Sequence, residues 1–300
     1  MPSTFRLQKK RQWLFLWFFL PAVVVLVTIT IFPFIYSVII SLTDMEIARP
    51  QKGAPFVGLQ NYSDLLFHDA RFWNSVKVTF IFVLSAVLVE FLLGFALAYL
   101  LKDDFFGRKV VIALFIAPMV IPPVVSGLNW RFMYDDTIGL LNYLISFVGI
   151  GRHAWLGDPK LALPAIIVTD IWQWTPFLML IILAGFHALP VEPFEAARVD
   201  GASNWQILRY ITVPMLKQVI SVGILIRTIE LFRTFDTIFI MTEGGPGIAT
   251  EAMSIRSYLL GFRFFSTARA CAFSLIMLFL IMVVCTRFFN VIQKGDEGYA

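Results

Sequence analysis

Six long runs of apolar residues, separated by shorter polar segments, set the pattern of this 300-residue chain. The runs lie near residues 13–41, 76–101, 109–130, 162–186, 215–240 and 270–289. Each has roughly the 20 residues that an α-helix needs to cross a bilayer. Helices are expected because lipid offers no hydrogen-bonding partners, so each span must satisfy its own backbone groups. The pattern predicts an all-α integral membrane protein with six transmembrane helices between residues 13 and 289.

The composition supports a membrane protein and removes other classes. Hydrophobic residues make up 59% of the chain, above the roughly 45–50% of soluble domains. The net charge of +4 forms no basic stripe, so nucleic acid is not an expected partner. The three histidines show no metal-ligand spacing, so no metal site is expected. The first run is longer than the apolar region of a signal peptide and lacks its cleavage site, which predicts a retained span.

Basic residues near the ends of the runs predict the orientation. Cytoplasmic segments carry the higher density of Lys and Arg, and the clearest clusters are Lys9, Lys10, Arg11, Lys102, Arg108 and Lys109. Both termini are therefore expected in the cytoplasm, as tails of residues 1–12 and 290–300. The other cytoplasmic segments are then 102–108 and 187–214, and the external ones are 42–75, 131–161 and 241–269.

The longest cytoplasmic loop, residues 187–214, has the pattern of two short helices. Pro193 suits a first helical turn, which predicts a helix over Phe194–Asp200. Gly201 follows as a stop, because glycine readily adopts the left-handed conformation that ends helices. The loop is therefore expected to turn sharply at this glycine.

A second short helix is predicted directly after the turn. Ser203 and Gln206 form a capping-box pattern, which marks a helix start. The helix is expected to run towards Ile211 and to end before Pro214. The loop is either a plain connector between two spans or a docking knob for a soluble partner. The second interpretation is favoured by its apolar side chains, namely Phe194, Trp205, Ile207 and Leu208.

The same loop resembles the EAA loop of binding-protein-dependent ABC importer permeases. The matching residues are Glu195-Ala196-Ala197, Gly201, Ile211 and Pro214, and Val213 stands where the family has Leu. The resemblance implies a type I ABC importer permease whose loop docks into a cytoplasmic ATPase subunit and transmits its closure to the spans. ATP would then bind the partner, with no cofactor and no catalytic residue in this chain. The residues assigned to coupling are Glu195, Ala196, Ala197, Asp200, Gly201, Ile211 and Pro214.

Further stretches are similar to the carbohydrate branch of this family, the maltose-permease type. They are Phe72-Trp73-Asn74-Ser75, Pro118, Pro122-Pro123, Trp130, Gly139-Leu140-Leu141-Asn142 and Thr242-Glu243-Gly244-Gly245-Pro246-Gly247 with Thr250-Glu251. The resemblance implies a carbohydrate substrate and a bacterial inner-membrane location. The implied partners are a second, related permease subunit, two ATPase subunits and an extracytoplasmic solute-binding protein.

The fifth run carries four charges at every third position, Arg227, Glu230, Arg233 and Asp236, so that neighbours share a helix face. A central charge costs roughly 2.5–3.5 kcal/mol on insertion scales, whereas each Leu or Ile returns roughly 0.3–0.6 kcal/mol. The charged face is therefore expected to avoid lipid. Either the four charges neutralise one another and fix the helix against its neighbours, or some line the translocation path. In the second case Arg227 and Glu230 contact substrate hydroxyls or an anionic group, with Arg233 as a further candidate.

The fourth run offers candidates for a sugar-binding path. Asp170, Trp172, Gln173 and Trp174 combine aromatic faces with hydrogen-bonding groups, which suits a sugar, although the tryptophans are equally compatible with interfacial anchoring. Asn129 is a further candidate, and Glu90 is an isolated acid for which a structural hydrogen bond is favoured.

Three alternatives remain beside the ABC importer of neutral sugars. The charged fifth run is compatible with an ion-gradient-driven secondary transporter, and Arg227 and Arg233 leave room for an ABC importer of an anionic derivative, such as a sugar phosphate or sulfonated sugar. A membrane enzyme acting on lipid-linked sugars is disfavoured, because no P-loop, H-E-x-x-H or nucleophile-elbow pattern is present.

Overall fold

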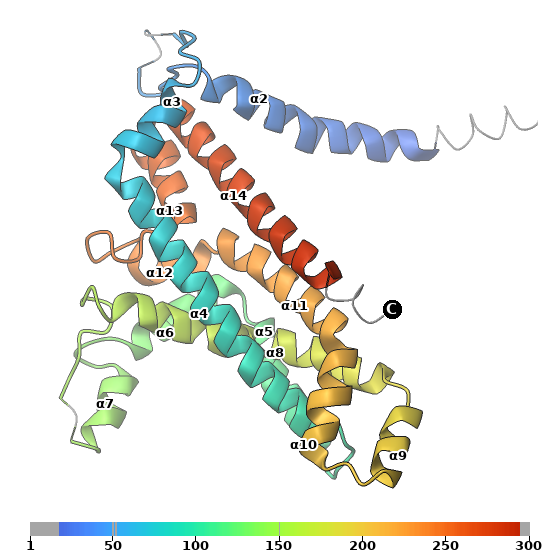
Figure 1. Ribbon diagram of the computed structural model, residues 1–300. Helices are drawn as coiled ribbons and strands as arrows, with labels where there is room; N and C mark the ends of the chain where they lie inside the picture. The colour runs from blue at the N-terminus through green and yellow to red at the C-terminus, as the bar shows by residue number, and fades with distance from the viewer. Residues whose placement is uncertain (1–17, 50, 52, 150, 295–300) are drawn as a thin grey trace, which may run out of the picture. The chain divides into compact units, whose positions relative to one another are not determined.

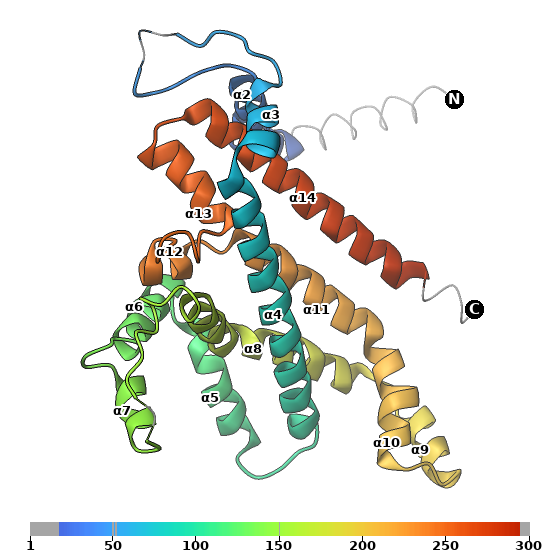
Figure 2. The same ribbon diagram turned by 60° about the vertical axis from the view of Figure 1, so that its left-hand side comes forward.

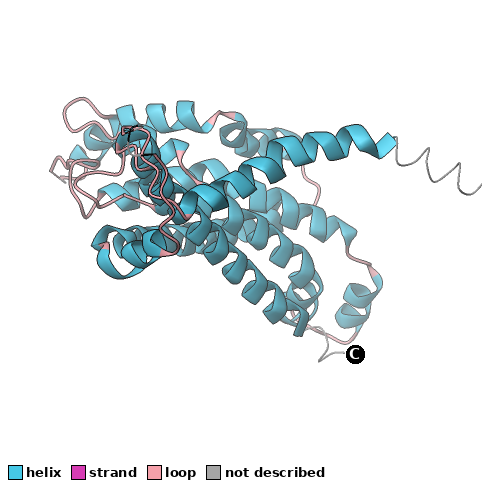
Figure 3. Cartoon of the chain, turned by 90° about the horizontal axis from the view of Figure 1, so that it is seen from above, coloured by secondary structure: helices cyan, strands magenta, loops and turns pink. Residues whose placement is uncertain are grey.

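The computed structural model describes residues 18–49, 51, 53–149 and 151–294. Regular secondary structure in these residues is helical throughout (Figure 3), apart from one isolated antiparallel bridge between Thr43 and Phe56. The all-α prediction is therefore confirmed for the part of the chain that is described.

The helices keep the order of the predicted runs (Figures 1 and 2). They are α2 (Phe32–Ser41), α3 (Gln60–Ser63), α4 (Ala70–Leu101), α5 (Arg108–Val120), α6 (Pro123–Met133), α7 (Leu140–Ser146), α8 (Ala162–Ala188), α9 (Glu192–Val199), α10 (Asn204–Ile207), α11 (Val213–Arg233), α12 (Asp236–Thr242), α13 (Met253–Tyr258) and α14 (Thr267–Lys294). Short π-helical turns cover Val27–Ile31, Asp64–His68, Leu208–Thr212 and Leu259–Arg263.

Among the described residues, four helices are long and apolar enough to cross a membrane: Phe18–Ser41, Ala70–Leu101, Ala162–Ala188 and Thr267–Asn290. The pair α5 and α6 makes a fifth if it is counted as one span. The count of six stays a prediction, because the charged α11 does not meet the same criterion. Residues 1–12 and the start of the first run, 13–17, lie outside the described residues. The helix α14 continues to Lys294, so the predicted tail at 290–300 begins as helix.

The predicted third span, 109–130, is not one straight helix. The axes of α5 and α6 meet at 94°, and Ile121 between them has an extended backbone. The physical cause is the pair Pro122 and Pro123, which lack N–H donors and force the preceding residue out of the helical conformation. Gln173 of α8 stabilises the break, because its Nε2 donates to the Ile121 carbonyl at 2.8 Å.

The predicted fifth span, 215–240, is also wrong as a continuous helix. The helix α11 ends at Arg233 and α12 begins at Asp236. Thr234 leaves the helical conformation, with φ −56° and ψ 119°. Its carbonyl accepts a hydrogen bond from Ser254 Oγ at 2.6 Å, which replaces the helical bond that the break removes.

The chain divides into two compact units, of which the smaller comprises residues up to His68 together with Ser257–Ile276. Within it, Asn61 Nδ2 donates to the carbonyls of Ser41 and Thr43 at 2.9 and 2.7 Å. Arg269 pairs with Asp64 at 3.3 Å. The Asn61 bonds fix the end of α2 to α3, and the Arg269–Asp64 pair joins α14 to the turn that follows α3.

The larger unit, Asp69–Arg256 with the chain from Met277, holds the candidate site. Its helices α4, α8 and α11 lie side by side in Figures 1 and 2 and are in contact. Their apolar contact is built from Ala98, Leu101, Leu178, Met179, Ile182, Leu183, Leu216 and Ile220. Gly94 permits the close approach of α4 to α8, since a Cβ there would lie 3.0 Å from the Met179 backbone nitrogen. Small residues at such contacts are typical of helix packing in membranes.

Candidate functional site

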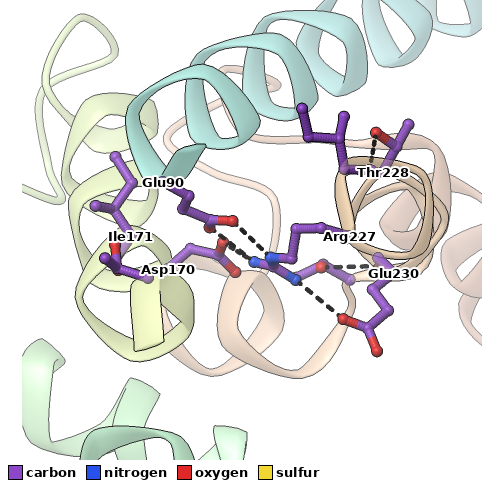
Figure 4. Close-up of polar contacts among 9 residues, drawn as sticks. Glu90, Asp170, Ile171, Arg227, Thr228 and Glu230 are labelled. Carbon is purple, nitrogen blue, oxygen red and sulfur yellow. Dashed lines mark hydrogen bonds and ion pairs between the residues drawn. The ribbon is translucent and has the colours of Figure 1, made fainter. Parts of the chain in front are cut away.

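A buried group of charged side chains joins the three central helices (Figure 4). Arg227 of α11 donates from Nε and Nη2 to the two carboxylate oxygens of Glu90 on α4, at 2.7 and 3.0 Å. Its Nη2 also pairs with Asp170 on α8. Because both Glu90 oxygens accept hydrogen bonds from one guanidinium, the geometry is the bidentate one expected of an ionised pair.

These three side chains are almost completely removed from solvent. The exposed fractions are 0% for Glu90 and 1% each for Asp170 and Arg227. Trp174 adds to the group, because the Arg227 guanidinium lies 5.1 Å from the centre of its ring. The main partners of Arg227 thus come from other helices. The neutralisation expected along α11 is limited to Glu230, whose Oε2 lies 3.6 Å from Arg227 Nη1.

A cavity of about 280 Å³ opens beside this buried group. Five of the predicted path residues line it, namely Asp170, Trp174, Arg227, Glu230 and Arg233. The remaining lining comes from Pro123 of α6 and the segment Thr234–Thr237 at the break between α11 and α12. The carboxylate of Glu230 is half-exposed, with 45% of its side chain accessible. The cavity therefore offers two guanidinium groups, carboxylates and an indole at one place, which together suit a hydroxyl-rich ligand.

The other three path candidates lie away from this cavity lining. Trp172 packs edge-to-face on Trp130 with ring centres 5.5 Å apart. Gln173 is fully buried and holds the Ile121 carbonyl at the α5–α6 break. Asn129 is exposed on α6. Asp170 and Trp174 are thus the members of the fourth-run group that the structure brings to the charged cavity.

Sequence reasoning missed the central role of Glu90. Its partner Arg227 lies 137 residues further along the chain, so no local spacing connects the two. The sequence feature that could have indicated this role is the acid itself, because an acid inside an apolar membrane helix requires a partner.

The loop at residues 187–214 folds into the predicted pair of short helices. The helix α9 begins at Glu192, two residues before the predicted start, and is followed by Gly201 with φ +78°. Ser203 caps α10, and its reciprocal bonds with Gln206 complete the capping box. The turn at the glycine and the cap are both confirmed.

The predicted helix end before Pro214 is wrong. The helix continues from α10 through the π-helical turn Leu208–Thr212 directly into α11. Pro214 has no N–H to donate, so a regular helix would lose a bond at this point. The wider turn accommodates the proline, because the Val213 N–H donates to the Leu208 carbonyl five residues earlier.

Of the four apolar side chains named for this knob, defined as residues 192–212, one is exposed, but Val199 and Tyr210 add further exposed apolar surface. Ile207 is buried, and Phe194 and Leu208 are half-buried. Trp205 remains 66% exposed. Of the residues assigned to coupling, Glu195, Ala196, Asp200, Gly201 and Pro214 are exposed, and Ala197 and Ile211 are half-buried.

At the other end of the larger unit, the family-like motifs contact one another. Asn74 Nδ2 donates to the Ile248 carbonyl at 2.8 Å, so the Phe72–Ser75 motif holds the loop after α12. The hydroxyls of Thr242 and Thr250 lie 2.7 Å apart and close that loop. Burial raises the pKa of Glu251 in this loop, although Arg256 and Arg71 oppose the effect.

The Gly139–Asn142 motif organises the neighbouring loop. Asn142 is buried and donates from Nδ2 to the His153 carbonyl at 2.9 Å. Its Oδ1 accepts from the His153 N–H and from Trp155 Nε1, at 3.1 and 2.9 Å. Asp135, in the loop before α7, accepts hydrogen bonds from Ile138 and Thr137, which lower the pKa of its carboxyl.

Helices long and apolar enough to span a membrane, a charged cavity and a helical knob are the features of a membrane transport subunit. The chain matches the family described as "Binding-protein-dependent transport system inner membrane component" over residues 90–294. It belongs to that family, whose members are the membrane-spanning permease components of ABC transporters.

Curated relatives agree with this membership. The chain is 38% identical over 268 residues to the probable ABC transporter permease protein y4oQ of Sinorhizobium fredii, covering 89% of this chain and 86% of the relative. It is 39% identical over 240 residues to the trehalose/maltose transport system permease protein MalF of Thermococcus litoralis, covering 80% of each. It is 31% identical to the trehalose transport system permease protein SugA of Mycobacterium tuberculosis, covering 93% of this chain and 88% of that one.

Solved structures show the same fold. A chain of a bacterial ABC transporter involved in the import of the acidic polysaccharide alginate superimposes with a TM-score of 0.83 at 23% identity, covering 96% of this chain and 99% of that chain. A chain of the alginate transporter in complex with an alginate pentasaccharide-bound periplasmic protein gives a TM-score of 0.79 at 24% identity, covering 93% of each. The type I permease architecture predicted from the EAA-like loop is supported at the level of the fold.

Proposed function

We propose that this chain forms half of the translocation path of an ATP-driven carbohydrate importer and is coupled to a separate ATPase through residues 187–214. The observation that carries the proposal is that the knob and the charged cavity lie at opposite ends of one helical run, residues 204–233. This run is continuous from the knob to the cavity, so a displacement of the knob is carried along it to Arg227.

The proposed substrate is a carbohydrate because the relatives named above include trehalose and maltose permeases. The cavity chemistry agrees with this choice. An indole face suits the C–H surface of a sugar ring, and the Arg227 and Glu230 side chains suit its hydroxyls. Asp170 and Arg233 complete the polar lining, whereas Trp172, Gln173 and Asn129 lie outside it.

The proposed complex has a second, related permease, two cytoplasmic ATPase subunits and an extracytoplasmic solute-binding protein. The presence of a bound periplasmic protein in the alginate structure supports the last partner. The chain is placed in the bacterial inner membrane with six spans and both termini in the cytoplasm, so that the knob faces the ATPases. ATP binding closes the ATPases, displaces the knob and shifts the paired spans from inward-open to outward-open packing.

Uptake in sealed membrane vesicles tests this proposal. Vesicles carrying the complete complex should accumulate labelled trehalose or maltose, supplied with the binding protein, only when ATP is inside the ATPase-facing compartment. An ionophore that collapses ion gradients should leave the rate unchanged. A complex whose ATPase subunit lacks its catalytic carboxylate serves as the matched control and should show no accumulation.

The rival function is a secondary transporter driven by an ion gradient. It is favoured by one observation, the group of ionisable side chains buried within the spans. Uptake that continues without ATP and stops with the ionophore would support this rival and overturn the proposal.

A further inference from the structure

Acidic side chains outnumber basic ones around the charged cavity. Asp170, Glu230 and Asp236 line it together with only Arg227 and Arg233. Glu90 lies directly behind Arg227 and adds a further carboxylate. The local charge is therefore negative, which bears on the choice between neutral and anionic sugars that the sequence leaves open.

The positive charge of Arg227 is already used by the protein. Its Nε and Nη2 donate to Glu90, and Nη2 also pairs with Asp170. Both acids are buried. The third, Nη1, faces Glu230 at 3.6 Å, which is beyond hydrogen-bonding distance. One guanidinium thus faces three carboxylates, so it can donate a hydrogen bond to a hydroxyl but offers no net positive charge to an anion.

Glu230 and Nη1 of Arg227 form a matched pair for a sugar. Glu230 is half-exposed, and an ionised carboxylate only accepts hydrogen bonds, whereas a guanidinium only donates them. Adjacent hydroxyls of a sugar can donate to one and accept from the other. A phosphate or carboxylate at the same place would accept from Nη1 but would be repelled by Glu230.

We infer that this cavity takes an uncharged, hydroxyl-rich sugar and disfavours carboxylated, phosphorylated or sulfonated ones, and that Glu90 determines this selectivity. Glu90 is a positioning residue, because it acts through Arg227 and does not line the cavity. The inference rests on the proposed function for its substrate, but the cavity charge can be measured independently of transport.

A thiol placed in the cavity measures this charge directly. Thr234 lines the cavity and is half-buried, so the Thr234→Cys variant is made in a background with Cys271→Ala and Cys285→Ala. The complete complex in membrane vesicles is treated with sulfonatoethyl methanethiosulfonate or with trimethylammonioethyl methanethiosulfonate. These reagents have similar size and opposite charge. The reaction rate of each reagent with the introduced thiol is divided by its rate with a small thiol compound in the same low-salt buffer. This division removes the difference in intrinsic reactivity between the two reagents.

The cationic reagent should react about tenfold faster than the anionic one in the otherwise unchanged cavity. Glu90→Gln should bring the two rates close together. At an effective dielectric of roughly 40, one unit charge about 12 Å away changes the local concentration of a monovalent ion about threefold, in opposite directions for the two reagents, so their ratio changes about tenfold. Rates that are equal before the substitution, or a ratio that Glu90→Gln leaves unchanged, would overturn the inference.

Two further variants distinguish a charge effect from a folding defect. Glu90→Gln combined with Arg233→Gln removes one charge of each sign and keeps the buried Arg227–Asp170 pair, so it should leave the ratio near that of the parent. Asp170→Asn removes the same charge as Glu90→Gln from another helix and should shift the ratio in the same direction. If the ratio of the cationic to the anionic rate changes in the charge-conserving double variant but not in Asp170→Asn, the effect of Glu90→Gln is not due to charge. Loss of ATP-dependent uptake with these ratios intact would instead count against the proposed function alone.

Discussion

The Arg227 guanidinium donates to both carboxylate oxygens of Glu90, at 2.7 and 3.0 Å, and so joins α11 to α4 inside the helical bundle. The pair is shielded from solvent and is completed by Asp170 from α8. Buried ion pairs contribute little compared with well-packed apolar residues, but removing one partner leaves an uncompensated buried charge. Loss of any one of these three side chains should therefore destabilise the packing of α4, α8 and α11.

Replacing Arg227 by Met should strongly destabilise the protein. The substitution retains most of the side-chain volume but leaves Glu90 and Asp170 buried without their cation, at a cost of about 3–5 kcal/mol. Thermal unfolding of the purified protein in detergent measures the effect. Arg233→Met is the matched control, because Arg233 is exposed on the same helix, and its effect should stay within about 0.5 kcal/mol. Equal losses in the two variants would contradict the importance given to the buried contact.

Gly201 replaced by Val should weaken coupling more than it weakens folding. Its φ of +78° is unfavourable for a β-branched residue. No atom of the described residues lies within 4 Å of the position that an added Cβ would take, so the strain is confined to the turn between α9 and α10. The complex should assemble with its ATPase subunits yet lose most substrate-stimulated ATP hydrolysis. Gly201→Asn should retain more activity, because Asn tolerates the left-handed conformation.

Gly149 provides the control for that experiment. It has a nearly equal φ of +76° and equally open surroundings, but it lies in the loop after α7, far along the chain from the knob. Gly149→Val should impose similar local strain and leave ATPase stimulation unchanged. Normal stimulation in Gly201→Val, or an equal loss in Gly149→Val, would refute the coupling role of the turn.

The regular features of the fold follow from local sequence. Apolar runs predict α4, α8 and α14, and the Gly201 turn and Ser203 cap are confirmed because each depends only on nearby residues. The misplaced features depend on more distant contacts. The break after Arg233 is supported by Ser254, twenty residues beyond Thr234, and the continuation through Pro214 depends on a π-helical turn.

The candidate site was predictable in its residue types but not in its pairing. The spacing of Arg227 and Glu230 indicates a shared helix face, and the structure places both at one cavity. No spacing shows that Glu90 receives the Arg227 hydrogen bonds, because the contact depends on how α4 and α11 pack. The tryptophans were ambiguous for the same reason, and packing separates Trp174 at the cavity from Trp172 on Trp130.

Asn142→Asp should loosen the loop that follows α7. The amide donates to the His153 carbonyl and accepts from Trp155 Nε1, whereas an ionised carboxylate would place an acceptor against that carbonyl. The cost should be about 1–3 kcal/mol, the usual penalty of an unsatisfied buried group. Limited proteolysis of the 131–161 segment measures it, with Asn129→Asp as the exposed control. Equal cleavage rates in the two variants would contradict the prediction.

Glu251 should make stability fall as the pH rises above the ordinary range of a carboxyl group. Its side chain is 4% exposed, and its Oε1 lies 3.5 Å from Arg256 Nη1 without a hydrogen bond. Burial raises its pKa, Arg256 and Arg71 lower it, and Asp69 raises it, with a net upward shift from the ordinary 4.5. The folded state therefore holds the proton more tightly than the unfolded state does.

The sign of the effect follows from this difference in proton binding. The stability that Glu251 contributes is fully present below pH 4.5, the ordinary pKa, and is lost as the pH rises through the raised value. Glu251→Gln keeps the neutral shape, so its melting temperature should rise relative to that of the unchanged protein as the pH increases through this window. Asp135→Asn should show the opposite trend, because hydrogen bonds lower the pKa of Asp135 and its contribution is lost as the pH falls. Parallel curves for Glu251→Gln and the unchanged protein would show that the Glu251 carboxyl is equally easy to ionise in the folded and unfolded states.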